Sequence, residues 1–310
     1  SHPKRPGRDK RGDPIDERDA SVVKINIAQL PARAAFSLIA LVAMAGYHLG
    51  MRDDVEVQLI ILCALLALTG LPHGAIDPAI ARKAGLWSGL TGLLTFSAGY
   101  LALAVFAVGI WFTLPELFII AMLALSAWHF SEDWSVYFNQ PVSLAISSAV
   151  ITLPSIFYSQ EVLAIFNLLA PTYSSAIVAG MAIFSIVSTL YVFFCCFKIP
   201  HKSQAVLAEL AVLFCAAMTL PPVPYFTVYF CFLHSPLHLS ESLEQLGWLE
   251  TVVYAVPFTV LSFAAGGIFF LSLPGMNFSF QLIQTIFIGL FALTIPHMLL
   301  IGTLNKGKNR

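Results

Sequence analysis

The stretch SGLTGLLTFSAGYLALAVFAVGIWF, residues 88–112, runs for 25 positions without a charged side chain. The hydrocarbon core of a membrane is about 30 Å thick, and a helix crosses it with roughly 20 apolar residues. Backbone amides in lipid need partners inside the protein, and a helix supplies them within one segment. We therefore predict a transmembrane helix here, and the rest of the chain repeats the pattern.

Comparable apolar segments follow one another along most of the 310 residues, of which 58% are hydrophobic and only 11% charged. The mean hydropathy is +0.82, which means more apolar surface than a soluble fold of this size could bury. We expect an all-α, polytopic transmembrane helical bundle with about 8–10 spans, because several segments are short or bounded by proline. The ten segments are approximately residues 32–50, 55–72, 88–112, 115–131, 142–159, 174–197, 204–220, 223–239, 251–273 and 280–302.

Polar sequence lies at both ends of the chain. Residues 1–31 are rich in charge and contain Pro3, Pro6 and Pro14, so this leader has too little apolar surface to fold alone. We expect it to be disordered or to lie on the membrane surface. The transmembrane domain, in which any catalytic site must lie, is predicted to cover residues 32–303, and residues 304–310 form a basic cytoplasmic tail.

Lysine and arginine beside the spans predict the orientation of the bundle, because these residues favour the cytoplasmic side. If the leader is cytoplasmic and successive breaks alternate, 15 of the 16 basic residues lie inside and only Arg52 lies outside. This indicates an even number of spans in the cell membrane, with both termini in the cytoplasm. Removing one pair of spans keeps the parity, so eight and ten both remain open. The inside residues are Lys4, Arg5, Arg8, Lys10, Arg11, Arg18, Lys24, Arg33, Arg82, Lys83, Lys198, Lys202, Lys306, Lys308 and Arg310.

Four of the five tryptophans fall near the ends of predicted spans, where the indole ring prefers the headgroup region of the bilayer. Trp87, Trp111, Trp134 and Trp248 are therefore interpreted as interface anchors. Trp128 differs because it lies within a span beside a histidine. It is our candidate for the wall of a substrate pocket.

Five of the eight histidines share one depth in this topology. His2, His48 and His201 fall in the leader or in breaks and are expected to be solvated or interfacial. The other five lie near the inner ends of spans that all run from the outer to the inner side. Polar groups in lipid are costly and usually face a bundle interior or mark function, so a shared partner is expected. These histidines are His73, His129, His234, His238 and His297.

A metal ion is the simplest shared partner. His234 and His238 are four residues apart, which places both rings on one helix face, although Pro236 between them can bend that helix. Asp77, Asp133 and Glu241 each follow a histidine by about one turn and could accept its second N–H, as carboxylates do for metal-bound imidazoles. For Asp77 the competing interpretation is a helix N-cap before Pro78. Each histidine could also simply bond a neighbouring helix.

The donor set leaves the metal's identity open, since imidazoles suit iron, copper, zinc and nickel. The five cysteines have no C-x-x-C spacing and are expected to be small core residues. Structural zinc is the poorest fit, because such sites staple small soluble domains and this chain has apolar surface to spare. An open redox metal beside an apolar cavity instead suggests O2 chemistry on a lipid-soluble substrate.

Four segments together resemble the Brp/Blh family of membrane-bound β-carotene 15,15'-dioxygenases. The similarity spans roughly residues 55 to 302, so the leader and the first span inherit nothing from it. The segments are L-P-H-G-A-I-D (71–77), W-H-F-S-E-D-W (128–134), H-S-P-L-H (234–238) and T-I-P-H-M-L-L (294–300).

The resemblance implies oxygen-dependent cleavage of the central double bond of β-carotene to two molecules of retinal, in microbes that use retinal in rhodopsins. It also implies Fe(II) held by the residues that match the family's iron ligands, His73, His129, His234 and His238. His297 is assigned beside the metal or on the substrate wall, together with Trp128 and the carboxylates Asp77, Asp133 and Glu241. The polyene would lie in a tunnel lined by some of the 25 phenylalanines.

Other functions remain open at this point. A different histidine–metal membrane oxygenase acting on lipids is one, although the di-iron desaturases need about eight histidines in repeated boxes and only one such pair exists here. A haem-binding electron carrier could use paired histidines as axial ligands. A proton-coupled transporter could use them as a relay, but it would place them in a midplane site. The H-E-x-x-H motif of a metalloprotease does not occur.

Overall fold

The computed structural model describes residues 29–50, 54–196, 204–273 and 275–308, and within these ranges it contains helices and turns but no strand. Most of the predicted leader therefore lies outside the described residues, and the last helix continues through the start of the predicted tail. The α-helices are α1 (Leu30–His48), α2 (Val55–Leu65), α3 (Leu71–Ala75), α4 (Asp77–Lys83), α5 (Gly89–Thr113), α6 (Pro115–Phe130), α7 (Gln140–Thr152), α8 (Pro154–Phe157), α9 (Ser159–Leu169), α10 (Ser174–Cys196), α11 (Gln204–Thr219), α12 (Pro222–Tyr229), α13 (Ser235–Leu246), α14 (Trp248–Leu271) and α15 (Phe278–Lys308).

The predicted helical bundle is confirmed, and each of the ten apolar segments contains helix. Among the described residues, seven helical stretches are long and apolar enough to cross a bilayer, so the chain is a multi-pass membrane protein. The other three segments correspond to α6 and α11, with 16 residues each, and to the interrupted run from α12 to α13. Whether the chain has the expected 8–10 spans therefore depends on how many of these three segments also cross the membrane.

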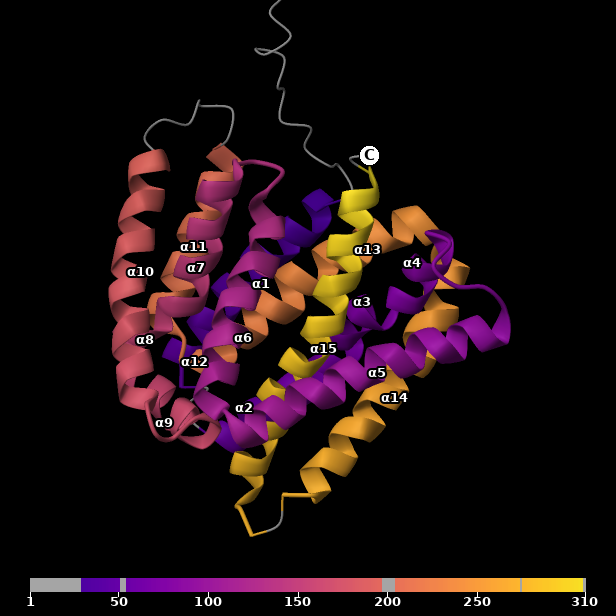
Figure 1. Cartoon of the computed structure of the whole chain (residues 1–310). Coiled ribbons are helices and arrows are strands. Elements are labelled where there is room, and N and C mark those ends of the chain that lie inside the picture. The colour runs from indigo at the N-terminus through magenta and orange to yellow at the C-terminus, as the bar shows by residue number, and fades with distance from the viewer. Residues whose placement is uncertain (1–28, 51–53, 197–203, 274, 309–310) are drawn as a thin grey trace, which may run out of the picture.

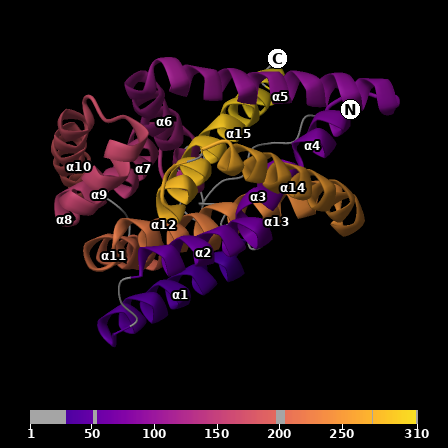
Figure 2. The same cartoon turned by 90° about the horizontal axis from the view of Figure 1, so that it is seen from below.

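The helices surround α15, which lies near the middle of the molecule and packs against α2, α5, α9 and α14 (Figure 1). Seen from below, α5 covers one side of α15, and α1 and α2 lie on the opposite side (Figure 2). Only 11% of the most apolar window of α5 and 17% of that of α14 is buried. These two helices therefore present apolar side chains to lipid, and the polar groups of the site lie inside.

The core packs around the loop that follows α6. Trp134 and Tyr229 are its largest fully buried side chains. Arg33 of α1 lies over Trp134, with its guanidinium carbon 5.6 Å from the ring centroid. Interface anchoring was thus the wrong expectation for Trp134, because α1 covers it. Trp248 is 73% exposed, as an interfacial ring should be.

Within the described residues two single π-helical turns interrupt the helices, one shortly before His73 and one that ends at His234. The first is Leu66–Gly70 (η2), where Leu71 N–H bonds the Leu66 carbonyl, and the second is Phe230–His234 (η5), where Ser235 N–H bonds the Phe230 carbonyl. Each ends two residues before a proline, Pro72 or Pro236. Proline lacks an N–H and its ring clashes with the carbonyl four residues earlier, so a widened turn accommodates it. The expected bend at Pro236 takes this form.

Candidate metal centre

All five histidines predicted to share one depth meet at one place. His73 comes from α3, His129 from the end of α6, His234 from the end of η5, His238 from α13 and His297 from α15. The ring centroid of His129 lies 4.7 Å from that of His234, 5.3 Å from His238 and 5.0 Å from His297. The ring of His73 lies 5.3 Å from His234 and 5.8 Å from His297.

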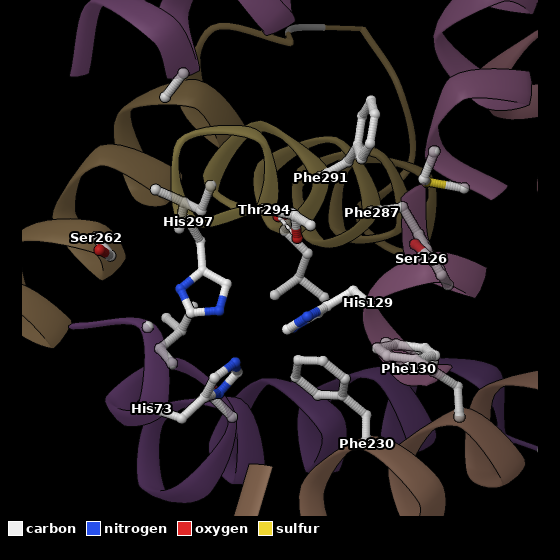
Figure 3. A pocket seen from close by; sticks show the side chains of 18 of the residues that line it. His73, Ser126, His129, Phe130, Phe230, Ser262, Phe287, Phe291, Thr294 and His297 are labelled. Carbon is white, nitrogen blue, oxygen red and sulfur yellow. Dashed lines mark hydrogen bonds between the residues drawn. The ribbon is translucent and has the colours of Figure 1, made fainter. Parts of the chain in front are cut away.

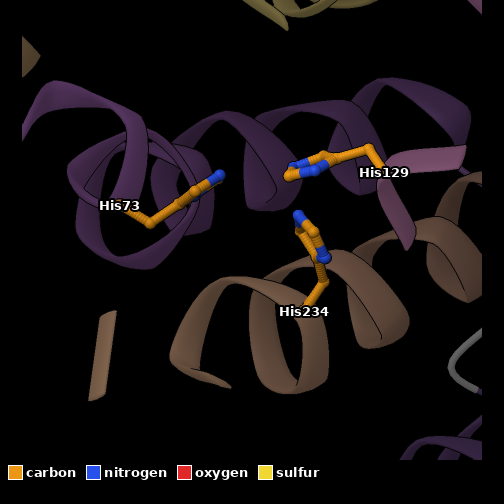
Figure 4. A group of neighbouring side chains, drawn as sticks. All are labelled: His73, His129 and His234. Carbon is orange, nitrogen blue, oxygen red and sulfur yellow. The ribbon is translucent and has the colours of Figure 1, made fainter. Parts of the chain in front are cut away.

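Three of these residues form a compact set of potential metal ligands. One ring nitrogen from each of His73, His129 and His234 lies within 4.8 Å of the other two. In Figure 4 these nitrogens point toward one another from three different helical segments. Nε2 of His234 is buried and has no hydrogen-bond partner in the described part of the chain. Buried nitrogens without a partner are costly, so the residues present fit a metal ion.

The carboxylate of Asp133 binds both His234 of η5 and His238 of α13, which lie one helical turn apart. Nδ1 of His234 and Nε2 of His238 each donate to it over 3.1 Å, and the Tyr229 hydroxyl donates over 2.6 Å. Asp133 was expected to accept a hydrogen bond from His129, four residues earlier, but it accepts from histidines of another segment. His129 Nδ1 instead has the Glu132 carboxylate at 3.8 Å. One carboxylate oxygen of Asp133 and one ring nitrogen each of His234 and His238 lie within 4.8 Å of one another, so these residues form a second cluster with metal-ligand spacing.

The carboxylate of Asp77 holds His297. It accepts Nδ1–H of His297 over 2.8 Å and the hydroxyl of Tyr100 over 2.9 Å, and it is fully buried. Neither sequence interpretation anticipated this pairing. The Asp77 side chain does not cap α4, and His73 donates its Nδ1–H to the Gly70 carbonyl within its own segment.

Glu241 is also placed differently from the expectation. Its carboxylate accepts a hydrogen bond of 2.6 Å from Gln29 Nε2, and His238 turns toward Asp133. All three carboxylates predicted to orient a histidine thus have partners from other segments. Tyr100 and Tyr229, which complete the two aspartate clusters, were not singled out from the sequence, since nothing in their local spacing marks them.

An apolar cavity of about 590 Å³ opens onto the histidines. His73, His129 and His297 line it, and eight phenylalanines contribute to its wall. In Figure 3 the rings of His73, His129 and His297 face one space beneath α15, with Phe230 beside them. Trp128 lies elsewhere: it is 52% exposed and lines a separate groove between α6, α7 and α10.

The family model and the curated relative that match this chain carry the same description. A family model described as beta-carotene 15,15'-dioxygenase matches residues 64–305. A beta-carotene 15,15'-dioxygenase from uncultured marine bacterium 66A03 is 30% identical over 252 residues, covering 77% of this chain and 90% of the relative. No solved structure matches.

Proposed function

Because the chain belongs to the beta-carotene 15,15'-dioxygenase family, we propose that it cleaves β-carotene with O2 at the central double bond and releases two molecules of retinal. One O2 supplies one oxygen atom to each aldehyde, so the reaction needs no further reductant. The observation that supports the proposal best is the cluster of buried histidines at the wall of a phenylalanine-rich cavity.

We expect Fe(II) as the bound metal, held by His73, His129 and His234 with His238 completing the set. A polyene has no acidic or basic group on which proton transfer could act, and bound iron would supply the redox chemistry that O2 requires. The buried Nε2 of His234, which has no hydrogen-bond partner among the described residues, supports this site. His238 is included because it lies one turn from His234, with ring centroids 4.6 Å apart, and because the family resemblance assigns it as a ligand; its Nε2 is engaged with Asp133.

The protein's own residues would contribute orientation and exclusion of water. Asp133 and Gly70 fix the rings of His234 and His73 by accepting their Nδ1–H groups, which leaves Nε2 of each ring free. The phenylalanines around the histidines keep the reacting bond in an apolar space. His297, held by Asp77, faces the same cavity and would contact the substrate.

Metal and product analysis together test this function. The purified protein should carry about one non-haem iron per chain, and cells that make β-carotene should accumulate retinal when they express it. A variant with alanine at His73, His129, His234 and His238 should lose both. Equal metal content in the wild type and this variant would refute the site.

The absorption spectrum of the same sample separates the remaining alternative sites. A haem carrier would show a strong Soret band, whereas the proposed iron site has none. A transporter would bind no stoichiometric metal and form no aldehyde. Transfer of retinal to a microbial rhodopsin stays an expectation of the family resemblance.

A further inference from the structure

The cavity extends to two sides of the histidines, and its two sides differ. In Figure 3, Ser262 of α14 lies to one side of His297 and His73, and Ser126 and Phe287 lie to the other side, beyond His129. We call the side lined by α5 and α14 the open arm. The side lined by α7, α9, α10 and α12 is the closed arm.

The side chains of the open arm face lipid as well as the cavity. Leu101 of α5 is 59% exposed, and Leu261 and Ile268 of α14 are 61% and 71% exposed. Small residues, including Ala265, lie between them on the cavity wall. A wall whose residues are both cavity-lining and widely exposed is an opening toward the bilayer.

Aromatic contacts hold α5 and α14 together at both ends of this opening. Near the start of both helices the ring of Trp87 lies 6.4 Å from that of Tyr254. Near their ends the rings of Trp111 and Phe112 lie 6.2 and 6.4 Å from Phe269. The open arm is therefore a lateral window of defined extent between two helices.

The closed arm ends inside the protein. Val150, Val162, Phe166, Leu169 and Tyr225 line it, and each is at most 7% exposed. Helix α9 forms its end and is tied down from two sides, because Trp111 Nε1 donates to the Leu169 carbonyl over 2.8 Å and Gln284 Nε2 to the Leu168 carbonyl over 2.7 Å. A chain that enters this arm meets a fixed stop.

We propose that the polyene enters from the bilayer between α5 and α14, passes the histidines and stops against α9, so that the closed arm selects which double bond lies at the metal site. This inference rests on the proposed function and adds the residues that determine regiospecificity.

The physical reason is that a hydrocarbon carotene offers no polar group by which its position could be fixed. Its conjugated double bonds are chemically similar, so the distance from an end is the main feature that distinguishes the central one. A steric stop measures that distance, and one carbon unit too many in a close-fitting apolar pocket costs about ten- to two-hundred-fold in binding. A tunnel open at both ends would have no such reference point.

Binding without turnover tests the closed arm. Full-length protein in lipid vesicles is kept under argon, and linear polyenes of increasing length are titrated while their quenching of tryptophan fluorescence is followed. Val162→Phe shortens the arm and should reduce the longest polyene that binds tightly, whereas Phe166→Ala should increase it. Ala164→Phe is the matched control, since Ala164 is an exposed residue of the same helix. A length limit that is identical in all four proteins would overturn the proposal.

The cleavage products provide the second measurement. Wild type should give two equal aldehydes, and Val162→Phe should give one shorter and one longer fragment with unchanged iron content. Ala164→Phe should cleave as wild type does. If wild type forms no aldehyde, the proposed function fails, but the length limit measured under argon still decides the role of the arm.

The window has its own test. Ala265→Trp places a large ring in the open arm, and it should slow transfer of carotenoid from vesicles to the protein by about tenfold. Val260→Trp is the control, because Val260 is 62% exposed on the same helix and lies outside the cavity wall. Equal transfer rates in both variants would exclude entry between α5 and α14.

Discussion

Asp133 is the residue on which the histidine cluster depends most directly. Its buried carboxylate accepts hydrogen bonds from two imidazoles and one tyrosine hydroxyl, so the orientation of His234 and His238 is coupled through a single group. Imidazoles held in this way present a defined tautomer and ring orientation to a metal. The charge that balances a bound cation thus lies directly behind its ligands.

Replacing Asp133 by asparagine should weaken metal binding. The amide carries no charge and cannot accept from both imidazoles equally well, so we expect the affinity for iron to fall by about 10- to 100-fold. Titration against a competing chelator measures the affinity. Asp54→Asn is the control, because Asp54 is the exposed N-cap of α2. An unchanged affinity in Asp133→Asn would show that the carboxylate does not support the site.

His297 provides a second prediction at this scale. His234 and His238 lie one turn apart with ring centroids 4.6 Å apart and can bind one ion together, whereas His297 lines the cavity from α15. We expect His297→Ala to keep near-normal iron content while retinal formation falls in part. His129→Ala should abolish both. If His297→Ala lost iron as completely as His129→Ala, His297 would be a metal ligand. Its hydrogen bond to Asp77 would then orient the ring as Asp133 orients His234.

At the scale of elements, α1 reaches the site although it precedes the residues that the family model matches. The Arg33 guanidinium donates to the Glu209 carboxylate of α11 over 2.7 Å and to the backbone carbonyl of Asp133. Its carbon also lies 4.8 Å from the ring centroid of Tyr137. The first span was expected to inherit nothing from the family, yet it braces the loop that carries Asp133.

This buried ion pair gives a stability prediction. Arg33→Met leaves the Glu209 carboxylate buried without its partner, which should destabilise the fold by about 3–5 kcal/mol. Adding Glu209→Leu should restore most of the loss, because an apolar pair of similar size avoids the cost of burying charge. Thermal unfolding of the purified protein measures both. The exposed Arg82 is the control, and Arg82→Met should change the midpoint little. A single variant as stable as wild type would contradict the bracing role of α1.

At the scale of the whole molecule, several helix ends that adjoin basic residues in the sequence lie on the same side of the bundle. The end of α10, the start of α11 and the end of α15 lie at one end of the bundle (Figure 1). Lysines at 198, 202, 306 and 308 belong to these breaks in the sequence. We infer that this end faces the cytoplasm, because basic residues are retained on that side.

Cysteine labelling tests the orientation. In a background without the five native cysteines, single cysteines near Lys83, Lys202 and Lys306 should react only when a reagent reaches the cytoplasm. A cysteine near Arg52, the one basic position expected outside, should react in intact cells. Labelling of any of the first three from outside would refute the arrangement.

The sequence by itself determined the class of fold and the set of histidines that meet at the site. Segments such as residues 88–112 must be helical in lipid, because no other local structure pairs all their backbone groups. Once the spans alternate, His73, His129, His234, His238 and His297 reach one depth without any knowledge of packing. The amphipathic helix α9 was missed, since a short helix between spans gives a much weaker signal than a span.

Only the tertiary structure decided which carboxylate holds which histidine and where the cavity ends. Spacing along a helix identifies neighbours one turn away, and from it Asp77, Asp133 and Glu241 were each paired with the nearest histidine. The actual partners depend on how each helix is rotated about its axis against the others. Hydropathy does not report that rotation, whereas the packing of α15 against α4 and of η3 (Ser131–Trp134) beside η5 settles it. The closed arm likewise exists only because α9 folds back beneath α15.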